Sequence, residues 1–205
     1  MVLPRHNRFA AQHLDALVYC PLNESWEQLT SRLADMNFRA LIVGPEGRGK
    51  STLLRGLSAW WMDRGYPAGT LRLAWGQRRL TLPQLDSVEK LPDEAILFVD
   101  SLEQLSWFGW RQLKAKSNRL RGILATSHRG GRLPILIECR TTLQLLIDLV
   151  KRLTGSADEL DSDFLRALFV RHRGDIRRCL RALYDWESQR PVPLASNGTS
   201  PISAS

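Results

Sequence analysis

The stretch "LIVGPEGRGKSTLL" at residues 41–54 constrains the fold of this chain more than any other segment. An apolar run ends at Gly44, two further glycines follow within five residues, and a Lys-Ser-Thr then opens a Leu- and Trp-rich stretch with helical spacing. Glycines let the backbone aim successive N–H groups at one point, and a helix N-terminus adds its dipole there. The stretch therefore predicts a strand over 38–43, an anion-binding loop, and a helix over 50–63.

The glycines and the lysine of this loop have the spacing of a known phosphate-binding motif. Gly44, Gly49, Lys50 and Ser51 fit G-x-x-x-x-G-K-[ST], the Walker A motif or P-loop. Lys50 is expected to reach the β- and γ-phosphates of ATP, and the Ser51 hydroxyl is expected to ligate Mg²⁺. The alternative is a glycine-rich turn without a ligand. The residues expected to bind the nucleotide are Gly44, Gly47, Arg48, Gly49, Lys50, Ser51 and Thr52.

The rest of the chain alternates strands with helices. Further strands are predicted at 70–75, 95–100, 122–128 and 133–139, one helix is predicted over 102–119, and three helices over about 142–153, 161–172 and 175–188. This order predicts an α/β fold, with a mostly parallel sheet flanked by helices and a small C-terminal helical lid. The expected division is an N-terminal segment 1–37 with an amphipathic helix capped by Asn23, an α/β core 38–140, a lid 141–188, and a Pro/Ser-rich disordered tail 189–205.

A second chemical element is the run "AILFVD", which ends at Asp100. A continuous apolar run is typical of a strand buried on both faces, and an acid at its carboxyl end has the Walker B pattern. Asp100 is expected to lie beside the loop and to hold Mg²⁺ together with Ser51, directly or through water. The alternative is an aspartate that only starts a turn.

Hydrolysis of ATP also needs a carboxylate that orients or deprotonates water. Ser101 stands directly after Asp100, and the next acid is Glu103. If residues 101–104 curl into a turn, Glu103 can point back to the γ-phosphate. The alternative is that Glu103 only stabilises the start of the following helix. Glu46, within the loop, is less suited because its side chain should lean away from the phosphates.

Polar side chains also end the predicted strand 122–128. Thr126, Ser127 and His128 would lie beside Asp100, where a polar group can bond the attacking water or the γ-phosphate, and His128 could donate a proton. The alternative is that Ser127 and His128 cap the loop that follows.

The segment "HRGDIRRCLRALYDW" predicts a helix that begins after Gly174 and is capped by Asp175. Its apolar residues recur at helical spacing, as Ile176, Cys179, Leu180 and Leu183. Arg177 lies off this stripe, where its planar fork suits phosphate oxygens. The alternative is a surface arginine paired with Asp175 or Glu187.

Taken in order, "GPEGRGKS", "FVD", "ATSH" and "GDIRR" resemble the AAA+ superfamily of P-loop ATPases, over roughly residues 38–186. The resemblance implies that "ATSH" is the polar strand end called sensor 1 and that Arg177 is the lid arginine called sensor 2. Together with the reasoning above, this resemblance gives ATP and Mg²⁺ as the expected cofactors, and Glu103, Ser127, His128 and Arg177 as the expected catalytic residues.

The sequence departs from this family in two ways. The acid expected directly after Asp100 is missing, and "D-S-L-E" resembles the spaced acid of STAND-type signalling ATPases. An arginine finger is not evident, and Arg129, Arg132 and Arg140 are candidates by position only. Both departures concern turnover more than binding. The L-S-G-G-Q signature of ABC ATPases and the N-K-x-D motif of GTPases are absent.

Charge and cysteine content bear on partners and location. The net charge is +8, and 24 of the 29 basic residues are arginines, which indicates either nucleic-acid binding or a GC-rich coding bias. Cys20, Cys139 and Cys179 are few and far apart, which predicts reduced thiols in a cytoplasmic protein. No membrane span and no secretion signal are predicted.

The sequence leaves three function classes open. The first is an ATP-dependent switch or weak ATPase, acting as a homo-oligomer or with a protein partner. The second is a small-molecule kinase, in which "RGGRLP" would close over a substrate. The third is a DNA-associated ATPase, for which the positive charge is the motivation.

Overall fold

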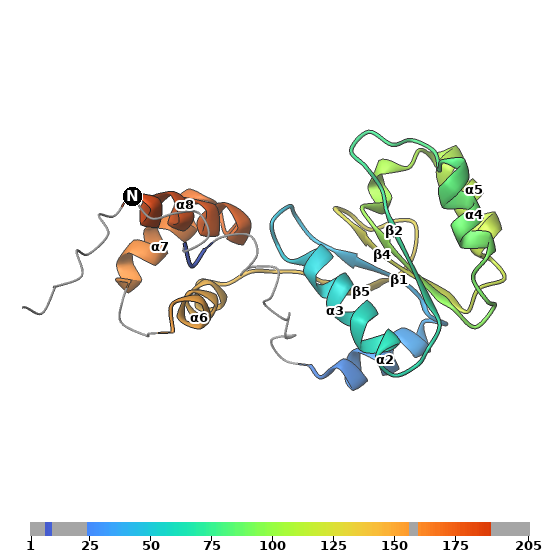
Figure 1. The fold of residues 1–205 in the computed structure, drawn as a ribbon, viewed down its shortest axis with the longest axis horizontal. Coiled ribbons are helices and arrows are strands. Elements are labelled where there is room, and N and C mark those ends of the chain that lie inside the picture. Colours follow the sequence, from blue (N-terminus) through green and yellow to red (C-terminus); the bar gives the residue numbers. More distant parts are fainter. Residues whose placement is uncertain (1–6, 10–23, 156–159, 190–205) are drawn as a thin grey trace, which may run out of the picture.

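The computed structural model describes residues 7–9, 24–155 and 160–189. Helices and strands alternate along most of this length (Figure 1). The elements are α2 (Trp26–Asp35), β1 (Arg39–Val43), α3 (Lys50–Met62), β2 (Ala68–Arg72), α4 (Leu82–Glu89), β3 (Ile96–Asp100), the 3-10 turn η2 (Leu102–Gln104), α5 (Trp107–Ser117), β4 (Gly122–Ser127), β5 (Ile135–Glu138), α6 (Leu143–Thr154), α7 (Ser162–Arg171) and α8 (Ile176–Ser188).

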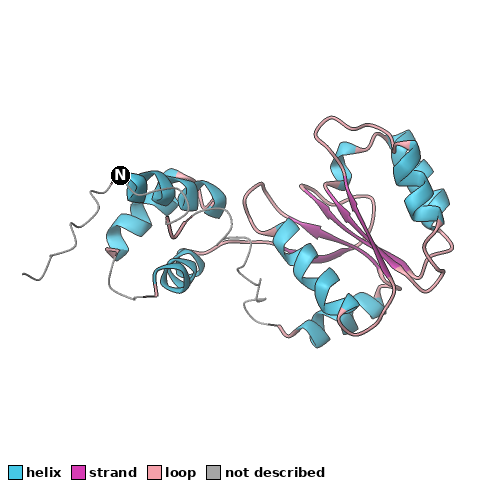
Figure 2. Ribbon diagram, viewed as in Figure 1, coloured by secondary structure: helices cyan, strands magenta, loops and turns pink. Residues whose placement is uncertain are grey.

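The described strands form one sheet with the order β2-β3-β4-β1-β5, and every pair is parallel. Helices cover both faces (Figure 2). Side chains of β1 alternate between the two faces, because Leu41 and Val43 pack with α4 and α5 whereas Ala40 and Ile42 pack with α2 and α3. Burial on both faces explains the apolar runs of β3 and β4. The predicted α/β fold with a parallel sheet is confirmed.

The C-terminal helices α6, α7 and α8 form a separate cluster with its own core. The stripe predicted for the last helix is buried there, since Ile176, Cys179, Leu180 and Leu183 all contribute to this core. Asp175 caps α8 by accepting a hydrogen bond from the Arg178 N–H, as the sequence predicts.

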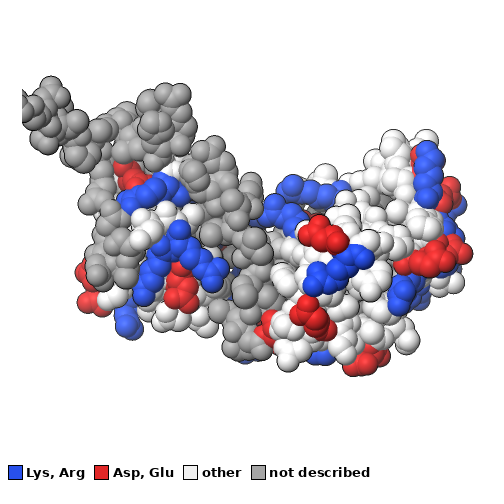
Figure 3. Space-filling model, turned by 60° about the horizontal axis from the view of Figure 1, so that its bottom comes forward, with Lys and Arg blue, Asp and Glu red and all other residues white. Residues whose placement is uncertain are grey.

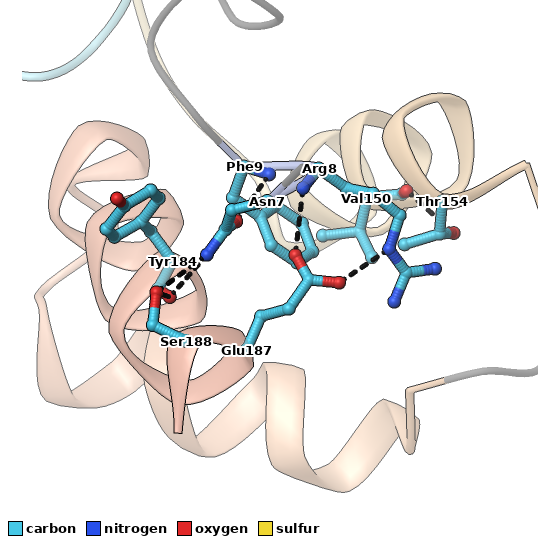
Figure 4. Close-up of polar contacts among 8 residues, drawn as sticks. All are labelled: Asn7, Arg8, Phe9, Val150, Thr154, Tyr184, Glu187 and Ser188. Atoms are coloured by element: carbon cyan, nitrogen blue, oxygen red, sulfur yellow. Dashed lines mark hydrogen bonds and ion pairs between the residues drawn. The ribbon is translucent and has the colours of Figure 1, made fainter. Parts of the chain in front are cut away.

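Residues 7–9 pack onto these C-terminal helices (Figure 4). Phe9 is buried in their core. The Asn7 amide donates to the Tyr184 carbonyl at 2.8 Å, and the Arg8 guanidinium lies 2.6 Å from a carboxylate oxygen of Glu187. The N-terminal end of the described chain is therefore fixed to α8, far from it in sequence.

The single helix predicted over 102–119 is wrong. The chain makes the turn η2, extends at Leu105, and begins α5 only at Trp107. The reason is Ser106, whose N–H and hydroxyl both donate to the Arg78 carbonyl and whose hydroxyl oxygen accepts from the Gly109 N–H. These bonds make Ser106 a cap and interrupt a continuous helix.

Other predicted boundaries also differ. Strand β2 ends at Arg72 rather than at 75, because its partner β3 ends at Asp100 and the ladder stops there. Helix α2 is capped by Ser25 in a capping box with Gln28, whereas Asn23 lies outside the described residues. The predicted disordered tail lies almost wholly beyond them.

Two of the three cysteines lie within the described residues. Cys139 and Cys179 are buried and free, and burial raises the pKa of each thiol to about 11; Cys20 lies outside the described residues. Among the described helices, none combines the length and the apolar character that crossing a membrane requires.

Gly109 allows the loop after β2 to lie against α5. A Cβ at this position would lie 2.3 Å from the Arg78 carbonyl oxygen, which Ser106 holds in place. Helix propensity alone would favour alanine by about 1 kcal/mol, but overpacking against backbone costs about 1–3 kcal/mol. We therefore expect Gly109→Ala to lower the free energy of unfolding, measured by urea titration. Phe108→Ala, at the exposed neighbour, is the control; a Gly109→Ala protein as stable as the parent would contradict the prediction.

Candidate functional site

The glycine-rich loop joins the carboxyl end of β1 to the first turn of α3. Gly47 and Gly49 have φ values of 72° and 84°, which only glycine adopts readily, and Gly49 is the N-cap of α3. Gly44, at φ 149°, approaches the Cys139 backbone so closely that a Cβ would lie 2.7 Å from its carbonyl oxygen. Ser51 and Thr52 follow, half-buried in the first turn. The loop thus has the backbone of an anion-binding helix start.

Lys50 is folded into this loop. Its side chain is buried, and its ammonium donates to the Pro45 carbonyl at 2.8 Å. Burial lowers the pKa of Lys50, and nearby acids, with Glu103 the strongest, oppose that shift. An ammonium has three donors, and the Pro45 carbonyl is its one acceptor among the described residues. Lys50 therefore retains the capacity to bind an anion in the loop.

Asp100 joins three elements at the carboxyl edge of the sheet. One of its oxygens, Oδ1, accepts from the Ser51 hydroxyl at 2.8 Å and from the Thr126 hydroxyl at 2.6 Å. The Thr126 oxygen in turn accepts from the Ser101 N–H at 2.7 Å, and Ser101 has a left-handed backbone with φ 68°. The two predicted metal ligands, Ser51 and Asp100, are therefore in contact.

Sequence reasoning placed Thr126 beside Asp100 but expected its hydroxyl to bond the attacking water or the γ-phosphate. In the structure this hydroxyl donates to Asp100 Oδ1. The sequence signal for this bond was a polar residue at the end of one strand and an acid at the end of the neighbouring strand. Neighbouring parallel strands end at the same edge of the sheet, so the two side chains can meet there.

Glu103 lies in η2 and turns back towards the loop. Its carboxylate is close enough to Lys50 and Arg132 to influence the pKa of both. Its Oε2 atom is buried and accepts no hydrogen bond from any described residue, whereas Oε1 lies 3.6 Å from Nε2 of His128. A buried carboxylate oxygen without a donor is costly in a folded protein, and a water or ligand at this point would satisfy it.

The other two residues of "ATSH" have different surroundings. Ser127 is buried, and its hydroxyl oxygen accepts from the Arg129 N–H at 3.4 Å, which agrees with the cap alternative. The His128 side chain is partly exposed and faces Glu103. His128 is therefore connected to the candidate site through Glu103, whereas Ser127 lies at the margin of the site.

Arg48 links the loop to the C-terminal helices. Its guanidinium donates to the Thr141 hydroxyl and to the Arg173 carbonyl, and the Thr141 hydroxyl donates to the Gly174 carbonyl at 2.6 Å. At Gly47, a Cβ would lie 1.9 Å from Asp175 Oδ1. The loop and the start of α8 are therefore in direct contact, and Arg48 points out of the loop.

Arg177 also faces the loop. Its guanidinium lies 4.0 Å from the Glu46 carboxylate, with both side chains mostly exposed. The partners that the sequence offered as alternatives are engaged elsewhere, since Asp175 pairs with Arg178 at 3.5 Å and Glu187 pairs with Arg8. Exposed pairs of this kind contribute little stability.

The three candidate arginine fingers differ in whether their guanidinium groups are bonded to other residues. Arg132 donates to the carbonyls of Leu102 and Leu105 at 2.8 and 2.6 Å. Arg140 lies 3.0 Å from the Glu138 carboxylate, and Arg129 is exposed. Arg132 therefore helps to hold η2, the turn that carries Glu103.

The oxygens available for a cation fit a nucleotide-bound Mg²⁺ better than a site made of protein alone. No group of three or more His, Cys, Asp and Glu side chains gathers within the described ranges. Ser51 and Asp100 offer two oxygens side by side, and Mg²⁺ is usually held by one or two protein ligands with waters and substrate phosphates completing its shell.

No family model matches this chain, and no curated protein matches its sequence. Solved structures do match its fold. The Holliday junction branch migration motor RuvB of Thermotoga maritima aligns with a TM-score of 0.54 and 17% identity, covering 79% of this chain and 60% of that one. The replication initiator DnaA, bound to AMPPCP and single-stranded DNA, aligns with a TM-score of 0.59 and 15% identity, covering 86% and 64%. The chain thus spans less than two thirds of either protein.

Proposed function

We propose that this chain, which has the fold of the AAA+ P-loop ATPases, binds ATP with Mg²⁺ and acts as a weak ATPase or nucleotide-dependent switch. The observation that carries the proposal is the cluster at the carboxyl edge of the sheet. Ser51 and Thr126 both bond Asp100, beside the loop that holds Lys50. The unpartnered oxygen of Glu103 lies at the same edge.

Each of these groups has a distinct role in the proposal. The N–H groups of residues 47–52 and the Lys50 ammonium bind phosphate oxygens, and Ser51 with Asp100 holds the cation. Thr126 fixes the orientation of the Asp100 carboxylate. When bound, Mg²⁺ neutralises phosphate charge and ATP supplies a γ-phosphoryl group that water can accept.

Glu103 is the proposed acceptor for the proton of the attacking water. Its Oε2 has no other described partner, so it is available to a water molecule. His128 contacts Oε1 and positions the carboxylate. Ser127 is left with a supporting role in this loop.

The C-terminal helices are the proposed moving part. We place a lid at 141–188 on a core at 38–140, with 1–37 and 189–205 flanking them. Arg48, Asp175 and Arg177 are the contacts through which occupancy of the loop would change the lid position. A γ-phosphate would compete with Glu46 for Arg177, and its multiple negative charge makes it the stronger partner.

We expect Arg177→Ala to lower the preference for ATP over ADP, because only ATP carries the phosphate that Arg177 would reach. The fold should be unaffected, since the side chain is mostly exposed. Arg178→Ala is the matched control, because Arg178 is the next residue and pairs with Asp175 instead. ATP and ADP affinities of both variants are measured by calorimetry. Equal shifts of the ATP/ADP ratio in the two variants would exclude the role proposed for Arg177.

The function itself is tested by the rate of ATP hydrolysis without any acceptor substrate, at several protein concentrations and with and without DNA. A rate that rises more than linearly with protein concentration supports a homo-oligomer, and stimulation by DNA supports a DNA-associated ATPase. Turnover only when a small acceptor is added would support the kinase alternative. The bonds from Arg132 to Leu102 and Leu105 argue against that alternative, because they fix an arginine that a substrate lid would need free.

A location in the cytoplasm and a protein partner remain parts of the proposal. The buried free thiols Cys139 and Cys179 support a reducing compartment.

A further inference from the structure

Large aromatic side chains are exposed in the loop after β2 and at the start of α5. Trp75 is 90% exposed, Trp107 59% and Phe108 66%, and Leu82 at the start of α4 is 81% exposed. Tryptophan is seldom left this open, because burying such a ring is among the most favourable ways to remove apolar surface from water. We call these four residues, with Arg78, Arg79 and Arg111, the aromatic–arginine surface.

Hydrogen bonds hold the segments of this surface together. The Arg78 carbonyl accepts from both donors of Ser106, directly before Trp107. The Gly76 N–H, directly after Trp75, donates to Gln104 at 2.9 Å. The loop after β2 is therefore fixed against the first turn of α5, and α4 packs beside α5 (Figure 1). The aromatic rings are presented on a defined backbone.

The rings are also placed relative to one another. Trp107 and Phe108 meet edge to face with centroids 5.0 Å apart. The Arg111 guanidinium lies over the Trp107 ring, 4.8 Å from its centroid. Such contacts keep each ring in one orientation while leaving much of it open to solvent.

The arginines of this surface have no acidic partner among the described residues. Arg78, Arg79 and Arg111 are exposed, and none forms an ion pair with a carboxylate in the part of the chain that the structure describes. Arginines elsewhere do, as in Arg64 with Glu27, Arg119 with Asp93 and Arg178 with Asp175. Figure 3 shows another face of the molecule, on which several Lys and Arg side chains lie close to Asp and Glu side chains.

We propose that the aromatic–arginine surface binds single-stranded nucleic acid. Bases would stack on Trp75, Trp107 and Phe108, and the unpaired arginines would contact phosphates. A duplex keeps its base faces stacked inside and could use only the arginines. An apolar protein partner would bury the arginines without counter-charges, which is costly. A single strand offers base faces to the exposed rings and phosphates to the arginines at the same time.

The test measures fluorescence anisotropy of labelled oligonucleotides of about 20 nucleotides, titrated with the full chain without ATP at several salt concentrations. The arms are a deoxythymidine strand, a uridine strand and a mixed-sequence duplex. The two single strands distinguish DNA from RNA. Both should bind more tightly than the duplex, with affinity falling as salt rises. Because no nucleotide is present, the result is independent of the proposed ATP site.

Variants separate stacking from charge. The double variant Trp107→Ala with Phe108→Ala should bind single strands roughly 5- to 100-fold more weakly, since stacking of a base on an aromatic ring contributes that much. Arg78→Ala with Arg79→Ala should instead reduce the slope of log affinity against log salt, by about 0.7 for each phosphate that the arginines no longer neutralise. Trp75→Ala, in a different segment, gives a second and independent measure of how much stacking contributes to the affinity for single strands.

The matched control is Arg64→Ala, because Arg64 also lies over a tryptophan, Trp60, but is paired with Glu27 on the far side of the sheet. It should leave binding unchanged. Equal affinity for single strands and duplex, or unaltered binding by both aromatic variants, would overturn the proposal. So would sedimentation showing that the aromatic double variant only disrupts self-association, which would assign the surface to a second copy of the chain.

Discussion

Glu103→Gln is expected to lower the rate of ATP hydrolysis about 100-fold or more while leaving the affinity for ATP nearly unchanged. Glutamine keeps the size of the side chain and its contact with His128, but it cannot accept a proton. A loss of 100-fold corresponds to about 2.7 kcal/mol in the activation free energy. Single-turnover hydrolysis and calorimetric binding, measured on the same preparations, separate the two effects.

Glu46→Gln is the matched control, because Glu46 is the acid within the loop itself. Its side chain is 71% exposed and faces Arg177, whereas that of Glu103 is 23% exposed and has a buried oxygen. Glu46→Gln should therefore leave the hydrolysis step almost unchanged. A comparable loss in both variants would show that general charge near the loop, and not proton transfer by Glu103, controls the rate. An unchanged rate in Glu103→Gln would show that Glu103 does not accept the proton of the attacking water.

The strands and the loop could be predicted because their signals are local. An apolar run on each side of a glycine-rich turn, and an acid at the end of a second run, require only a few neighbouring residues to be interpreted. For the same reason the sequence predicted that Asp100 and Ser51 lie together, since both are expected at the carboxyl edge of a parallel sheet. Their contact at 2.8 Å agrees with that pairing.

The surroundings of Glu103 were only half predictable. A turn over 101–104 was one of two alternatives, and the structure has it as η2. The break before α5 depends on the Arg78 carbonyl, which is 28 residues away from Ser106. No local pattern encodes such a bond, so a continuous helix was predicted over 102–119.

Contacts between the loop and the C-terminal helices were beyond sequence reasoning. Arg48 reaches Thr141 and Arg173 across 93 and 125 residues. From the sequence, Arg48 could only be assigned to the loop in which it stands. Residues 7–9 are a further case, because their packing against Tyr184 and Glu187 follows from the tertiary fold alone. The helices that face the loop are thus attached both to it and to the N-terminal end of the described chain.

Lys50→Ala is expected to weaken ATP binding roughly 30- to 150-fold, or about 2–3 kcal/mol, because the variant cannot form the charge-assisted bond to phosphate. The unliganded protein should lose no stability. Burial lowers the pKa of Lys50, so folding already disfavours its charged form, and its partner among the described residues is one carbonyl, that of Pro45. Calorimetry with ATP and thermal unfolding without it measure the two quantities. Lys90→Ala, at an exposed helix end, should change neither. If Lys50→Ala binds ATP as tightly as the parent, the loop does not hold phosphate, and the proposed ATPase or switch function fails with it.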